Sequence, residues 1–297
     1  MFKHTLNRAV VRLRFETVSP LLIRAGDTGL DPARADLSCV RTRHATLGTT
    51  VYIPGSSAKG VIRSAAEALI RGLGPKMACD PLDHRSNCVA SLDRKLPTAA
   101  LHAGHCLACR LFGSTRLRGR CAIRDLFPFA PGEAVAGEDF ARANRVEARN
   151  GVGIDRISGA VRVGPFDFEM VPAGARFFGD VALVNVQAWQ LGLLAAGLRA
   201  LDEGAVQLGS TKSRGLGVVR VAIDEVLFEQ SARGPARPVG VGELVAADER
   251  RAYALRDERA LPSLPGTTTG LTRRFVVAGP DAAKWLWATE EALAVLA

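Results

Sequence analysis

Four cysteines constrain this 297-residue chain more than any other feature of its sequence. They are spaced Cys79-x8-Cys88-x17-Cys106-x2-Cys109 and fall in a segment, residues 75–125, that has little hydrophobic periodicity. Such a segment needs something other than an apolar core to hold it, and a Cys-x-x-Cys pair lets two thiolates point at one ion. The spacing therefore predicts a structural zinc site with these four thiolates as its ligands.

Alternatives to this ligand set come from three nearby histidines, since His84, His102 or His105 could supply the fourth ligand. Chance clustering of buried thiols is the competing explanation. Catalytic zinc is disfavoured, because four protein ligands close the site and neither His-x-Glu nor His-Glu-x-x-His occurs. Cys39 and Cys121 lie outside the cluster, and we expect them to be small buried residues.

The net charge of the chain favours a polyanion as its partner. Lysine and arginine number 39 against 30 acidic residues, which gives +9. An arginine-rich composition without any such partner is the alternative, and aromatic residues at 6% argue against a broad base-stacking surface. No apolar run approaches about 18 residues, and Arg8 follows the N-terminus closely. We therefore expect a cytoplasmic protein with no membrane partner.

Hydrophobic periodicity predicts an α+β chain in the order strand, helix, strand, strand, helix, strand. This order is that of the ferredoxin-like (RRM-like) fold, an antiparallel sheet with both helices on one face. The predicted elements are a strand at 9–15, a helix capped by Ser56 or Ser57 and ending near Gly72, strands at 161–170 and 176–186 joined as a hairpin, a helix from Asn185 to Gly204 and a strand at 218–223.

Two stretches that combine small residues with cations are candidate phosphate-binding sites. The first, residues 55–60, reads Gly-Ser-Ser-Ala-Lys-Gly and lies where a strand passes into a helix, so that free amides, hydroxyls and Lys59 come together. The second, residues 208–217, is rich in glycine and serine and carries Lys212 and Arg214. An ordinary capped turn and a flexible hairpin loop are the alternatives that remain open for the two stretches.

Four motifs occur in a fixed order along residues 9–228. They are Ile-Pro-Gly-Ser-Ser-Ala-Lys-Gly-Val-Ile-Arg at 53–63, Cys-x-x-Cys-Arg-Leu-Phe-Gly at 106–113, Gly-Ile-Asp-Arg at 153–156 and the glycine-rich loop at 209–217. In this order they resemble the motifs of the CRISPR RAMP superfamily, whose members are RNA-binding proteins with ferredoxin-like folds. Within it, the chain resembles the repeating backbone subunit of a type III, III-D-like, RNA-guided effector complex.

The resemblance implies the partners of the chain and the residues that meet them. The partners would be a guide CRISPR RNA, a complementary target RNA, further copies of the chain and other effector subunits. The implied RNA contacts are Ser56, Ser57, Lys59 and Arg63 in the first stretch and Lys212, Ser213, Arg214 and Gly215 in the second.

The resemblance also implies a division of the chain. Residues 1–229 would form the RNA-binding domain, with 75–125 as its zinc-binding insertion. Residues 140–165 would form a thumb that kinks the guide–target duplex at regular intervals. The resemblance does not explain residues 230–297, which we treat as a C-terminal extension.

In this family, a loop aspartate after the first strand cuts the target RNA, within the pattern Asp-x-Pro, two apolar residues and a base. Residues 36–41, Asp-Leu-Ser-Cys-Val-Arg, match this pattern with Ser38 in place of proline. The resemblance thus makes Asp36 the catalytic candidate, with Asp27 and Asp31 as weaker ones. The carboxylate would position a divalent cation such as Mg²⁺, or orient the ribose 2′-hydroxyl for attack.

Two other functions remain open at this stage. The chain could be a purely structural guide-binding subunit whose targets are cut by a partner nuclease. It could also be a repeat-processing endoribonuclease, a metal-independent enzyme that matures guide RNA and relies on histidine or tyrosine near the first helix. Only His44 and Tyr52 are available for that second role.

Overall fold

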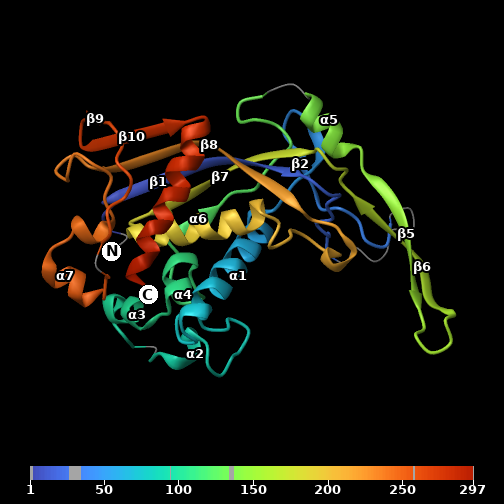
Figure 1. Ribbon diagram of the computed structural model, residues 1–297, viewed down its shortest axis with the longest axis horizontal. Coiled ribbons are helices and arrows are strands. Elements are labelled where there is room, and N and C mark those ends of the chain that lie inside the picture. Colours follow the sequence, from blue (N-terminus) through green and yellow to red (C-terminus); the bar gives the residue numbers. More distant parts are fainter. Residues whose placement is uncertain (1–2, 27–34, 94, 134–136, 257, 297) are drawn as a thin grey trace.

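A six-stranded antiparallel sheet forms the centre of the molecule (Figure 1). The computed structural model describes residues 3–26, 35–93, 95–133, 137–256 and 258–296. Across the sheet, the strands are β4 (Cys121–Ile123), β7 (Arg176–Val184), β1 (Asn7–Thr17), β8 (Val219–Ser231), β10 (Thr272–Ala278) and β9 (Gly266–Thr269). The predicted α+β class with an antiparallel sheet is therefore confirmed.

Strand β1 organises this sheet, because it pairs along its length with both β7 and β8. Its residues alternate as the sequence predicts. Leu13 and Phe15 are buried in the core, whereas Arg12 and Arg14 lie on the opposite face and form ion pairs with acidic residues of β8. One face of the sheet thus carries the hydrophobic core, and the other carries charged side chains.

Two long helices, α1 (Gly55–Leu73) and α6 (Ala188–Asp202), pack against each other and form the core with the sheet. They approach closely where Gly197 of α6 meets α1, since a Cβ atom there would lie 3.0 Å from the carbonyl oxygen of Ile62. Helix α6 is buried almost all round, because α8 (Pro280–Ala288) and the following 3₁₀ segment (Thr289–Val295) also pack against it.

The caps of the two long helices differ from the prediction. Neither Ser56 nor Ser57 caps α1; instead, the carboxylate of Asp125 accepts a hydrogen bond from the Gly55 N–H at 2.7 Å. For α6, Gln187 and its partner three residues later form a reciprocal capping box, while Asn185 binds the N-terminal segment. The first error arises because a distant carboxylate satisfies a free amide that local sequence would otherwise have to cap, and the second because the local capping box starts two residues after Asn185.

The predicted hairpin between residues 161–170 and 176–186 is wrong. Strand β6 (Val161–Met170) pairs instead with β5 (Glu147–Ile154), and the two strands form an arm that projects from the body (Figure 1). In the main sheet, β7 lies between β1 and the three-residue β4, which is too short to show periodicity. The outer half of β6 is exposed, so its alternating valines do not mark a core face.

The remaining elements are short and lie around this framework. Residues from the C-terminal extension add β9 and β10 to the edge of β8, and α8 buries Trp285 and Leu286 in the same core. None of the helices in the described ranges has the length and apolar character needed to cross a membrane. The short elements are β2 (Arg41–His44), β3 (Gly48–Val51), α2 (Cys88–Ser91), α3 (Thr98–Gly104), α4 (Leu107–Phe112), α5 (Glu138–Asn144) and α7 (Ala247–Ala252).

The packing of the C-terminal segment on α6 predicts an intolerant glycine. A Cβ atom at Gly192 would lie 2.5 Å from the Thr289 carbonyl oxygen, so Gly192→Ala should lower the free energy of unfolding by about 1–3 kcal/mol. Gly72→Ala is the matched control, because no atom lies within 4 Å of its added methyl group. That control should stabilise the helix by about 0.5–1 kcal/mol. Urea denaturation measures both, and equal effects would contradict this packing.

Candidate metal centre and RNA-binding surface

The four cysteines predicted as ligands come together in the structure. Their sulfur atoms all lie within 4.8 Å of one another. The Sγ atoms of Cys79 and Cys109 are 3.7 Å apart. Two thiolates bound to one tetrahedral zinc ion at about 2.3 Å take up almost this separation, about 3.8 Å. Within the described part of the chain, no other group of three or more potential ligands is found.

Local backbone structure aims these sulfurs at a common point. Cys88 begins α2, and its sulfur accepts the N–H of Cys106 at 3.2 Å. Cys106 in turn caps α4, with its sulfur accepting the N–H of Cys109 at 3.5 Å. From α1, the guanidinium of Arg63 reaches the sulfur of Cys109 at 3.5 Å. Donors of this kind stabilise thiolates, which are the form that binds metal.

Hydrogen bonds among the thiols decide which sulfur carries negative charge in the protein alone. The pKa of Cys106 falls, because the thiols of Cys109 and Cys88 donate hydrogen bonds to its sulfur. The pKa of Cys88 rises to about 12, chiefly because its proton is held by Cys106, and the pKa of Cys109 rises for the same reason. Among these three thiols the negative charge is thus favoured at Cys106, and a bound cation would stabilise the others as thiolates. An all-sulfur, largely buried donor set fits zinc.

Two of the three alternative histidine ligands are engaged elsewhere. His102 donates from Nδ1 to the Tyr253 carbonyl oxygen at 2.9 Å and accepts from Arg120 at Nε2. Burial, with Arg120 beside it, lowers its pKa to about 3. His105 bonds at both ring nitrogens, to the Leu101 carbonyl and the Ser114 hydroxyl. Neither histidine belongs to the sulfur group.

The third histidine, His84, is exposed, whereas the two cysteines outside the group, Cys39 and Cys121, are buried. His84 is exposed and lines a hollow beside Cys79, outside the group of four sulfurs. Cys39 and Cys121 are buried, as the sequence predicts, and burial raises the pKa of each thiol to about 12. These two thiols are therefore neutral packing residues.

The first candidate phosphate-binding stretch opens α1. Ser56 and Lys59 line a hollow of about 710 Å³ between this helix and the cysteine-rich segment, and Ser57 lies half-buried in the first turn. Arg63 is engaged in ion pairing with Glu67 at 2.7 Å and donates to the Gly113 carbonyl oxygen at 3.0 Å. Arg63 thus ties α1 to the metal centre, while Lys59 has no ion-pair partner among the described residues.

The second stretch is a loop pinned to the segment after β1. The N–H of Ser210 donates to the Leu22 carbonyl at 2.8 Å, and that of Gly217 to the Pro20 carbonyl at 2.9 Å. Gly217 has φ of +89°, and a Cβ atom there would lie 2.0 Å from a backbone oxygen, so only glycine fits. This fixed backbone leaves a short exposed turn composed of Lys212, Ser213, Arg214 and Gly215.

That exposed turn lies against the base of the arm. The guanidinium of Arg214 is 5.9 Å from the ring centroid of Phe166, which belongs to β6, in a cation–π contact. Lys212 forms no ion pair with any residue that the structure describes. The loop therefore presents two cations and close backbone amides next to the arm, an arrangement suited to phosphate.

The catalytic candidate Asp36 is exposed and held at one oxygen. Its Oδ2 accepts the N–H of Asp167, on β6, at 3.1 Å. Within the described ranges, no two further carboxylates or histidines join it to form a metal-binding group. The weaker candidates Asp27 and Asp31 lie outside the described residues.

An aromatic stack, which the sequence did not reveal, contains both residues named for the repeat-processing alternative. The ring centroids of Tyr52 and Phe127 are 5.8 Å apart, and those of Phe127 and Phe129 are 5.2 Å apart. His44 meets Phe129 edge-on at 4.8 Å, and its Nδ1 accepts the N–H of Leu47. His44 also meets Phe127 edge-on at 6.5 Å, so the Phe127 ring lies between Tyr52 and His44, which share no hydrogen bond of the kind a catalytic pair would form.

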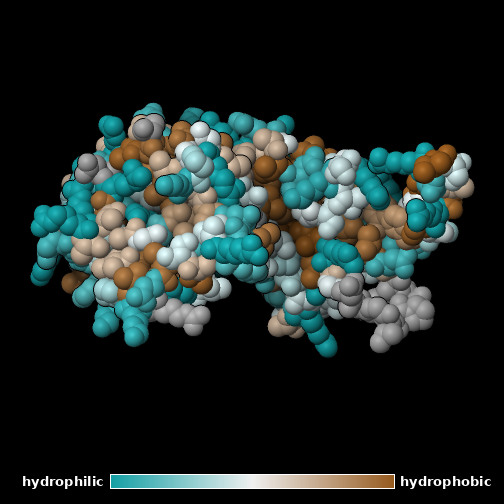
Figure 2. Space-filling view, turned by 90° about the horizontal axis from the view of Figure 1, so that it is seen from below, coloured by the Kyte–Doolittle hydropathy of each residue, from teal (hydrophilic) through white to brown (hydrophobic). Residues whose placement is uncertain are grey.

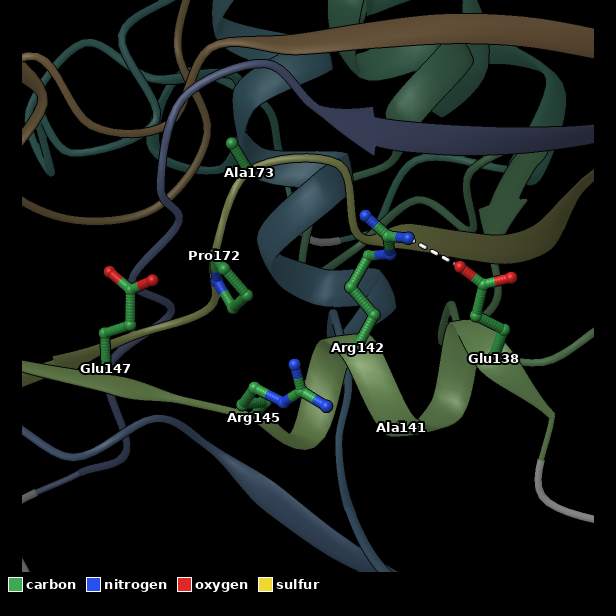
Figure 3. A pocket seen from close by; sticks show the side chains of 7 residues that line it. All are labelled: Glu138, Ala141, Arg142, Arg145, Glu147, Pro172 and Ala173. Carbon is green, nitrogen blue, oxygen red and sulfur yellow. Dashed lines mark hydrogen bonds and ion pairs between the residues drawn. The ribbon is translucent and has the colours of Figure 1, made fainter.

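A second hollow, of about 350 Å³, lies at the base of the arm (Figure 3). Arg142 on its wall is paired with Glu138 at 2.6 Å, whereas Arg145 has no partner in the described part of the chain. Glu147 supplies a second carboxylate to the lining, so that the two arginines are balanced by two acids. This balance gives the hollow no preference for an anion.

A comparison with known protein families covers the metal centre, the arm and both candidate phosphate-binding stretches. A family model described as RAMPs, RAMP superfamily, matches residues 14–220. The matched range begins in β1 and ends in β8, so it includes α1, the sulfur group, the arm and the glycine-rich loop. The comparison with curated proteins gives no match.

The sulfur geometry predicts one zinc ion per chain. Replacing Cys106 and Cys109 together by serine should remove this ion and destabilise the protein, because metal binding at such sites contributes to folding free energy. Elemental analysis of purified protein measures the zinc directly. Cys39→Ala is the matched control, since this thiol is buried outside the group, and it should keep the metal. A double variant with unchanged metal content would refute the assigned site.

Proposed function

The chain belongs to the RAMP superfamily, and from this membership we propose that it is a CRISPR-associated RNA-binding subunit. More specifically, we propose the repeating backbone subunit of a type III effector complex, in the III-D-like branch. In this proposal, copies of the chain stack along the spacer of a guide RNA. Together with other effector subunits, they organise the complementary target RNA.

The topology of the sheet supports this proposal. Strands β4, β7, β1 and β8 lie side by side in that order. Along the chain, α1 lies between β1 and β4, and α6 lies between β7 and β8. This succession of strands and helices supports the ferredoxin-like unit that the sequence predicts. A fold alone does not establish a function, so the loops of this unit and the groups they carry decide between functions.

The observation that carries the proposal is the rigid glycine-rich loop. Its backbone is pinned by hydrogen bonds to residues 20–22, so the exposed turn at 212–215 is held in place before any ligand binds. A pre-ordered loop loses little entropy on binding, and its small residues let a phosphate approach the backbone. Lys212 and Arg214 supply the charge. Such contacts bind the RNA backbone independently of its sequence.

The arm formed by β5 and β6 supports a role in assembly on RNA. Its outer half exposes Val152, Ile154, Ile157, Val161 and Val163, and Figure 2 shows hydrophobic side chains at the outer end of this projection. Exposed apolar side chains in such number mark an interaction surface. We propose that the arm is the thumb that kinks the guide–target duplex at regular intervals.

Target cleavage is the further activity that we propose to test. Asp36 is exposed next to the base of the arm, where its carboxylate is oriented by the N–H of Asp167. An oriented carboxylate can position a ribose 2′-hydroxyl for attack on the adjacent phosphate. The second candidate function is a purely structural subunit, which the lack of further described metal ligands around Asp36 favours.

The loop proposal predicts a change in the salt dependence of RNA binding. Replacing Lys212 and Arg214 by alanine removes two phosphate contacts. The negative slope of log K against log salt should therefore become shallower by about 1.4, or 0.7 per contact on single-stranded RNA. Filter binding or fluorescence anisotropy at several salt concentrations measures this slope. The matched control removes two exposed cations elsewhere, Arg251 and Lys284, and should leave the slope unchanged. Equal slopes for wild type and the loop variant would exclude this loop from the phosphate path.

The cleavage proposal predicts a selective loss. Asp36→Asn keeps an oxygen for the Asp167 N–H but removes the charge, so binding of guide and target should survive. Cleavage of end-labelled target RNA should fall by about 100-fold or more on a denaturing gel. A target left intact by the wild-type complex would favour the structural function. A variant that cuts like wild type would remove Asp36 from the mechanism.

A further inference from the structure

The hollow between α1 and the cysteine-rich segment has the size and lining of a ligand site. Its volume of about 710 Å³ falls within the range of about 300–1,000 Å³ that is typical of small-molecule pockets. One wall is the first turns of α1, and the others are residues 81–89 and the loop 113–119. The metal centre joins these walls, because Cys79, Cys88 and Cys109 also line the hollow.

The loop 113–119 is a fixed wall. The Ser114 hydroxyl accepts the N–H groups of Arg116 and Leu117 and bonds to Nε2 of His105 at 2.9 Å. The Arg116 guanidinium donates to backbone carbonyls of residues 89, 92 and 93, which joins this wall to its neighbour. At the ends of the loop, a Cβ atom on Gly119 would lie 2.5 Å from a backbone oxygen. The shape of the hollow therefore exists before a ligand arrives.

The charges around the hollow select an anion. Among the described residues that line it there is no aspartate or glutamate, whereas Lys59, Arg118 and His84 contribute basic groups. Arg63 lies against the Cys109 sulfur, where it partly offsets the negative charge that thiolates bring. The hydroxyl and backbone N–H of Ser56 bond to no residue that the structure describes. Together with Lys59, three residues further along the helix, they form a partner for phosphate.

The rest of the lining suits a planar base. Leu117 and Val89 provide apolar contact. The Thr115 hydroxyl and the amide nitrogen of Asn87 have no hydrogen-bond partner in the described ranges, so each can bind the polar edge of a base. A base that is unstacked from its neighbours gains from such a combination of contact and hydrogen bonding.

We propose that this hollow receives one unstacked nucleotide of the bound RNA, with its base between residues 81–89 and 113–119 and its phosphate at Ser56 and Lys59. The proposal rests on the RNA-binding function proposed above and adds a base site to it. The metal centre would then act on RNA indirectly, because it holds the walls of the site at the correct distance from α1.

Photo-crosslinking tests where the base lies. The intact chain is bound to RNA in which uridines are replaced by 4-thiouridine, irradiated, digested and analysed by mass spectrometry. We expect crosslinks to residues 81–89 and 113–119. Crosslinks confined to the loop 209–217, with RNA affinity intact, would overturn the base site and leave the RNA-binding function standing. Failure of the wild-type chain to bind RNA would overturn both.

Two variants test the same site by affinity. Thr115→Trp fills the hollow and should weaken RNA binding about tenfold and abolish the crosslinks at 81–89, with zinc content unchanged. Leu82→Trp is its matched control, because Leu82 is exposed on the same segment and does not line the hollow; it should bind like wild type. Lys59→Ala, which leaves the walls intact, should also weaken binding severalfold. Wild-type affinity and crosslinks in Thr115→Trp and Lys59→Ala would refute the proposal.

Discussion

The four clustered thiols, and arginines that donate hydrogen bonds to backbone carbonyls, hold the cysteine-rich segment in place. They are needed because residues 79–105 of this segment have no hydrophobic core of their own. Of the described residues from 79 to 105, none belongs to the buried apolar cluster of the molecule. Burial of apolar surface, the usual source of stability, therefore does not hold residues 79–105, and it resumes at α4, whose Leu107 and Leu111 belong to the cluster. The proposed RNA surface depends on the same constraint, since residues 81–89 form one wall of the hollow beside α1 and Arg116 joins them to the other wall, 113–119.

Two buried arginines stabilise the same region by donating to backbone carbonyls, so their positive charge is not available on the surface. Arg110 is buried and donates to three backbone carbonyls, including that of Ala254 in the C-terminal extension. Arg120 is also buried, donates to the Asn185 carbonyl, and has its pKa lowered to about 10 by burial. Part of the excess positive charge thus acts inside the protein. The cations that remain for RNA are fewer and more localised than the net charge of +9 suggests.

Features with a local chemical cause could be predicted from the sequence. The alternation in β1 and the four-cysteine spacing are both of this kind. The errors arose where distant residues decide the outcome. Asp125 caps α1 from the loop after β4, and the three-residue β4 is recognisable only by its pairing with β7. Arg63 lies in a motif that implies RNA contact, yet its position beside Cys109 is a tertiary fact that no local pattern encodes.

Hydrogen exchange of the intact chain, with and without a zinc chelator, shows whether the metal holds the cysteine-rich segment. We expect faster exchange in residues 79–105 and 113–119 and in the first turn of α1 after zinc is removed, while β1, β7 and β8 keep their protection because the apolar core holds them. Unchanged exchange in residues 79–105 after complete removal of the metal would contradict this expectation. It would mean that thiol coordination does not hold the segment on which the proposed RNA site depends.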